Sequence, residues 1–144
     1  MTGSAAFPAD VAALLEGLEP GRTLWMQGLG RSMWPLLHPG SEIRVLRCEP
    51  VQLSPGDTVF SVLPSGQPVV HLLLATTPVR TAGLLRSEDV PGGRLLGKVV
   101  AVKLKGREVP FPSAVGPLLL GTRTAARMPV LLGAARVARR LLRE

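Results

Sequence analysis

Short runs in which apolar and polar residues alternate recur through the middle of the chain, at intervals of about ten residues. Pro- and Gly-rich stretches such as Ser54–Asp57 and Pro64–Pro68 separate these runs and are typical of turns. Closely spaced strands with turns between them favour a mostly antiparallel sheet over alternating strands and helices. The predicted strands are Thr23–Met26, Ile43–Leu46, Thr58–Leu63, Val69–Leu74 and Leu95–Leu104.

The two ends of the chain have helical spacing instead. Apolar residues recur every three or four positions in Pro8–Leu18, and Glu19-Pro20-Gly21 would end that helix. Beyond Pro110 the chain is rich in Leu, Ala and Arg, which predicts helices at Thr122–Met128 and Val130–Leu142. We therefore divide the chain into an N-terminal helical segment (1–22), a β domain (23–112) and a basic C-terminal helical tail (113–144).

Composition narrows the class of protein. The 144 residues suit one domain, and 46% hydrophobic residues are enough to bury a core. A single cysteine, Cys48, excludes an intramolecular disulfide and a Cys-based zinc site, and with two histidines we expect neither a metal nor a cofactor. Because we find no apolar run of roughly 20 residues and no secretory signal, we expect a cytoplasmic protein.

The net charge of +7 is concentrated at the C-terminal end. Residues 113–144 hold six arginines and one glutamate, a net charge of +5. Such a tail suits contact with a partner protein or peripheral contact with an anionic membrane surface. More often, a helix of this kind packs on its own domain or on a second copy of the chain. Aromatic residues make up 3% of the chain and there is no Tyr, so we do not expect nucleic-acid binding.

The most informative stretch for chemistry runs from Gly28 to Gly40. Ser32 lies in a turn framed by Gly28 and Gly30, where the backbone amides of Gly30 and Ser32 are suited to hold an oxyanion. A serine needs a base to take its proton. His71, in an apolar strand, is one candidate base, although a histidine in a strand is also commonly structural. His38, six residues after Ser32, would reach back only with strain.

Four motifs, in order, resemble the conserved boxes of the signal peptidase I family of serine peptidases. Gly30–Gly40 resembles the nucleophile box, a serine followed by Met, any residue and Pro. Ser54–Phe60 resembles the second Gly-Asp box, Val69–Leu72 the box with the general base, and Leu95–Val100 the closing Gly-Lys/Arg-Val strand. The first box departs from the family pattern, since Gly40-Ser41-Glu42 stands in place of Gly-Asp.

The resemblance implies a twisted, mostly antiparallel β fold, shared with self-cleaving SOS-type repressors. It also implies that Ser32 is the nucleophile and His71 the base, as in the family's Ser/His branch; bacterial members usually have Lys there. Thr81-Ala82-Gly83-Leu84 lacks the first Asp of that branch, which leaves Asp89 as the residue to orient His71, with Glu88 second. These two acids suit a solvated loop equally well. Lys98 is a rival base, at a closing-box position whose basic residue is usually structural.

Two functions from different classes follow. One is a soluble serine endopeptidase that cleaves a peptide or protein precursor such as a leader peptide, because the family's N-terminal membrane anchor is missing. Met33 and Trp34 would then contact the substrate, while core packing is the better interpretation of Trp25. The alternative is a catalytically inactive peptide-binding or scaffold module whose basic tail docks on a partner or a membrane.

Overall fold

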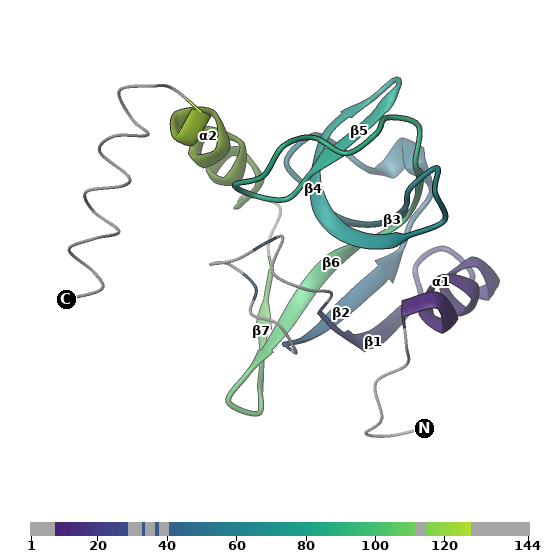
Figure 1. The fold of residues 1–144 in the computed structure, drawn as a ribbon. Helices are drawn as coiled ribbons and strands as arrows, with labels where there is room; N and C mark the ends of the chain where they lie inside the picture. The colour runs from purple at the N-terminus through teal and green to yellow at the C-terminus, as the bar shows by residue number, and fades with distance from the viewer. Residues whose placement is uncertain (1–7, 29–32, 34–36, 38–40, 112–114, 128–144) are drawn as a thin grey trace.

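A computed structural model describes residues 8–28, 33, 37, 41–111 and 115–127. Within these ranges the chain forms a mainly β structure with a helix near each end, which confirms the predicted fold class. The strands are β1 (Thr23–Gln27), β2 (Glu42–Arg47), β3 (Thr58–Val62), β4 (Pro68–Thr76), β5 (Val79–Ala82), β6 (Arg94–Leu104) and β7 (Arg107–Pro110). They form one antiparallel sheet in the order β1-β2-β6-β3-β4-β5, with β7 paired to β6 (Figure 1).

The longest strand, β6, joins the two parts of this sheet. One of its edges pairs with β2, whereas the other pairs first with β3 and then, further along, with β7. Gly97 lies where β6 passes closest to its neighbour, since a Cβ atom there would collide with the carbonyl oxygen of Leu46 and lie 2.9 Å from the Val45 side chain. A glycine inside this strand therefore permits a close approach of two backbones.

Both helices pack on the sheet and share one core with it. Helix α1 (Pro8–Gly17) buries Val11 and Leu15 completely, while helix α2 (Val115–Arg127) buries Leu119. Figure 1 shows α1 on the right of the view and α2 on the left. Their buried residues belong to the same apolar cluster as sheet residues such as Ile43 and Phe60. The helical ends are thus part of a common hydrophobic core.

Four features differ from the sequence predictions. Strands β5 and β7 and a short 3-10 helix, η1 (Pro50–Gln52), were not predicted, and α2 begins at Val115 rather than at Thr122. The turn between β6 and β7 has two residues with positive φ, Lys105 at 50° and Gly106 at 79°. Such a turn matches the twist of a tight hairpin, for which Asn-Gly is the more recognisable sequence. The second predicted tail helix, Val130–Leu142, lies outside the described residues.

Candidate active site

His71 lies in the middle of β4, between apolar neighbours that fix the strand. His71 as a whole is 8% exposed, and its register partner on β3 is Val59. The flanking Val70 and Leu72 point into the main core, so the imidazole is directed to the other face of the strand. A polar ring in such a place needs a hydrogen-bonding partner.

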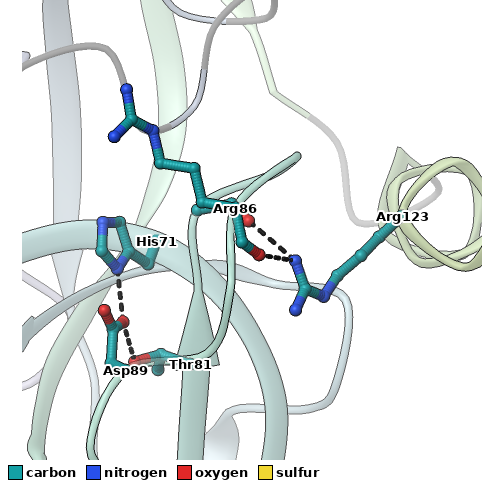
Figure 2. Close-up of polar contacts among 6 residues, drawn as sticks. His71, Thr81, Arg86, Asp89 and Arg123 are labelled. Atoms are coloured by element: carbon teal, nitrogen blue, oxygen red, sulfur yellow. Dashed lines mark hydrogen bonds and ion pairs between the residues drawn. The ribbon is translucent and has the colours of Figure 1, made fainter. Parts of the chain in front are cut away.

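That partner is Asp89, one of the two acids expected from the sequence. The Nδ1 atom of His71 lies 2.5 Å from Oδ2 of Asp89, and the two side chains are 11% and 15% exposed (Figure 2). Because an ionised carboxylate only accepts hydrogen bonds, Nδ1 carries the proton and donates it to Asp89. In the neutral ring this leaves the lone pair on Nε2, on the edge of the ring that faces away from Asp89 (Figure 2). The arrangement suits a general base.

Thr81, at the end of β5, orients the carboxylate in two ways. Its hydroxyl donates to Asp89 Oδ2 at 2.8 Å, and its carbonyl oxygen accepts the Asp89 backbone N–H at 2.9 Å. Thr81 was not expected as a site residue, because only acids were considered as partners of His71, and Leu84 stands where the resembled family has its first Asp. The available signal was the hydroxyl of Thr81, which can donate a hydrogen bond to a carboxylate.

Glu88, the second acid considered for His71, is instead engaged with Arg80. The guanidinium of Arg80 donates two hydrogen bonds, of 2.8 and 2.7 Å, to the two carboxylate oxygens of Glu88. These bonds raise the pKa of the Arg80 guanidinium. Of the two neighbouring acids, Asp89 is therefore the one that contacts His71, while Glu88 forms an ion pair with Arg80 on the exposed side of the loop.

The loop that leads to Asp89 is also held by helix α2. Arg123 is 5% exposed, and its Nη1 donates to the carbonyl oxygens of Gly83, at 3.1 Å, and of Arg86 (Figure 2). For Arg123, the alternative of packing on its own domain therefore holds, because its guanidinium is buried against the loop. The sequence identified Arg123 only as part of the tail's positive charge.

The proposed nucleophile segment is described at two positions. Ser32, Gly30 and Trp34 lie outside the described residues, whereas Met33 is 2% exposed and Leu37 is 5% exposed. Both of these side chains belong to the main core, and the Leu37 N–H donates to the Met33 carbonyl at 3.0 Å. The expectation that Met33 contacts a substrate does not fit a side chain packed in the core. Met33, the residue directly after Ser32, is instead held in the main core.

Trp25 is half-buried on β1, with the ammonium of Lys103 5.3 Å from its ring centroid. This is a cation–π contact, and Trp25 belongs to neither apolar cluster, so the expectation of core packing for Trp25 is wrong.

Lys98, the rival base, lies on β6 and is half-buried. Val59 on β3 is the register partner of both His71 on β4 and Lys98 on β6. The side chains of His71 and Lys98 are therefore on the same face of the sheet, with strand β3 between them. Lys98 lines a cavity of about 130 Å³ whose other lining residues include Asp57, Phe111 and Gly116. The only cysteine, Cys48, is 3% exposed, and burial raises the pKa of its thiol, so it is a poor nucleophile.

Within the described ranges, no group of three or more His, Cys, Asp and Glu residues is placed to hold a metal ion. No helix in those ranges is both long enough and apolar enough to cross a bilayer. In comparisons with known proteins, no family model, no curated protein and no solved structure matches this chain.

Proposed function

We propose that this protein is a serine endopeptidase in which Ser32, His71 and Asp89 act together. The observation that carries the proposal is the hydrogen bond between His71 Nδ1 and Asp89 Oδ2, which holds a largely buried imidazole with Nε2 directed away from the acid. Among the described residues no group hydrogen-bonds Nε2. The identity of the nucleophile rests on the motif around Ser32.

In the proposed reaction, the Ser32 hydroxyl attacks the carbonyl carbon of the scissile peptide bond and passes its proton to His71 Nε2. The backbone N–H groups of Gly30 and Ser32 stabilise the oxyanion that forms. The imidazolium, held by Asp89, then protonates the leaving amine, and a water molecule activated by the same imidazole hydrolyses the acyl-enzyme. Asp89 keeps its charge throughout and stabilises the imidazolium.

The substrate we propose is a peptide or protein precursor, such as a leader peptide, cleaved in the cytoplasm. The resemblance to signal peptidases supports a cut at a defined site in an extended chain. The enzyme and the scaffold alternative share the fold, and the His71–Asp89 pair supports the enzyme, because it orients the imidazole as a general base requires.

The decisive experiment compares new peptide termini after incubation of a cell extract with wild-type protein and with the variants Ser32→Ala, His71→Ala, Asp89→Asn and Lys98→Met. We expect Ser32→Ala and His71→Ala each to lower the cleavage rate at least a thousandfold, because nucleophile and base act as a unit. Asp89→Asn should also lose most activity, since the amide favours the wrong tautomer of His71.

The Lys98→Met variant is the control for the base. Cleavage should persist in it, and loss of cleavage in Lys98→Met but not in His71→Ala would make the enzyme a Ser/Lys peptidase. A Ser32→Ala variant with full activity would end the proposal. Thermal melts of each variant must show that it is folded, so that lost cleavage reports chemistry rather than unfolding.

A further inference from the structure

The position of Asp89 depends on the loop that connects β5 to it, and this loop is poorly held by contacts within itself. It leaves the sheet at Ala82 and returns at Glu88, the two residues that form an isolated antiparallel bridge. Gly83 and Leu84 are buried, whereas 85–88 are exposed to solvent. A loop of this kind is held by its ends and by whatever bonds its middle.

Helix α2 supplies hydrogen bonds to the middle of this loop. The Gly83 carbonyl accepts the Arg86 N–H at 3.2 Å, which closes a turn, and Arg123 donates to that same carbonyl and to the carbonyl of Arg86. Arg123 thus clamps both ends of the turn that precedes Glu88 and Asp89 (Figure 2). A hydrogen bond from a charged donor is roughly twice as strong as a neutral one.

The helix that carries Arg123 is itself fixed at two further points. Near its first turn, Gly116 packs directly on the backbone of Gly56, in the turn before β3. In its middle, Leu119 is 6% exposed and inserts into the main core. Arg123 therefore projects from a rigid support rather than from a loose tail.

We propose that Arg123 is a positioning residue for Asp89: through the turn Gly83–Arg86, helix α2 sets the orientation of Asp89 toward His71. The inference rests on the proposed function for its effect on catalysis, and on the contacts alone for its effect on geometry. Thr81 holds Asp89 itself and the Arg80–Glu88 ion pair holds the residue before it, while Arg123 holds the turn that precedes both.

The test uses the full chain with Arg123→Ala, Arg123→Lys and two controls. Thr124→Ala alters an exposed residue of the same helix, and Arg22→Ala removes an exposed arginine elsewhere. We measure the low-field NMR resonance of the His71 Nδ1 proton, amide exchange in 83–89, and kcat and KM separately. The first two readouts report geometry without any need for turnover.

We expect Arg123→Ala to broaden or lose the His71 Nδ1 resonance and to speed amide exchange in the loop. We also expect it to lower kcat on the order of tenfold, with KM almost unchanged because Arg123 is buried against the loop. Arg123→Lys, which keeps a charged donor, should restore part of each effect, and both controls should match the wild type.

An Arg123→Ala variant that folds and keeps the resonance, the exchange rates and kcat of the controls overturns the inference. Should that variant fail to fold, the same three readouts on Arg123→Lys decide, and wild-type values for all of them again overturn it. If the proposed peptidase function is wrong, the wild-type protein itself shows no Ser32-dependent cleavage. In that case the NMR and exchange data still show whether Arg123 positions Asp89.

Discussion

At the scale of single residues, two buried threonine hydroxyls are in opposite situations. Thr81 is 3% exposed and donates its proton to the Asp89 carboxylate. Thr58 is 1% exposed, and within the described residues its Oγ1 atom has no hydrogen-bond partner. Burying a hydroxyl without a partner costs free energy, whereas a bond to a charged acceptor more than compensates for burial.

Replacing each threonine by valine should therefore change stability in opposite directions. Thr81→Val keeps the shape of the side chain and should lower the free energy of unfolding by about 1.5–3 kcal/mol, because Asp89 loses a donor. Thr58→Val should raise the free energy of unfolding by about 1 kcal/mol, since an unpaired hydroxyl is removed. Denaturant unfolding of both variants measures the difference, and equal destabilisation of the two would contradict it.

The same residues show how far the sequence could predict the site. The order of the motifs singled out His71 and Asp89, and the structure brings these two side chains into contact. Thr81 and Arg123 were not anticipated as site residues, because their contribution depends on tertiary contacts. Arg123 bonds carbonyls 40 and 37 positions earlier in the chain, and no local pattern marks a backbone acceptor at that distance.

At the scale of elements, helix α2 depends on a contact between two glycines. A Cβ atom on Gly116 would lie 3.0 Å from the carbonyl oxygen of Gly56 and 3.1 Å from its carbonyl carbon. Since these are backbone atoms, they cannot rotate away as a flexible side chain would. Gly121, in the same helix, has open space where its Cβ would be.

We predict that Gly116→Ala destabilises the protein although alanine is the better helix former, because the clash with the Gly56 backbone pushes α2 off the sheet. Gly121→Ala is the matched control and should raise the free energy of unfolding by about 0.5–1 kcal/mol, the ordinary gain in helix propensity. Thermal melts followed by circular dichroism compare the two. A Gly116→Ala variant as stable as Gly121→Ala would show that the contact is unimportant.

These glycines also explain why the start of α2 was not predicted. The first seven residues of α2 include Gly116, Pro117 and Gly121, which are typical of turns, so the sequence pattern did not predict a helix there. The formation of this part of α2 depends on its packing against the sheet. The predicted strands, by contrast, were all found, because alternation reports directly which face of a strand is buried. Strands β5 and β7 have four residues each, too few for alternation to be distinctive.

At the scale of the whole molecule, the shared core predicts that sheet and helices unfold together. Leu119→Ala should lower the free energy of unfolding by about 2–5 kcal/mol, the usual cost of removing a buried leucine. The transition should stay single, because the cluster that contains Leu119 also contains residues of α1 and of the sheet. The neighbouring Leu118, 71% exposed, provides the control, and Leu118→Ala should change stability by less than about 0.5 kcal/mol.

Unfolding is best followed by far-UV circular dichroism and tryptophan fluorescence in the same denaturant series. Coincident curves for Leu119→Ala agree with one cooperative unit. A loss of helical signal before the fluorescence change would mean that α2 melts on its own, and that the common core is weaker than the packing implies.

The position of β6 in the sheet has a consequence for synthesis of the chain. Before β6 is made, β1 and β2 form one ladder and β3, β4 and β5 form another, with no strand between the two. His71 belongs to the second ladder, and the chain that contains Ser32 connects the strands of the first. On a ribosome, where the N-terminal part emerges earlier, the two ladders of a nascent chain have no strand pairing between them until β6 is made. We expect the proposed hydrolase to stay inactive until residues 94–104 have joined the two ladders.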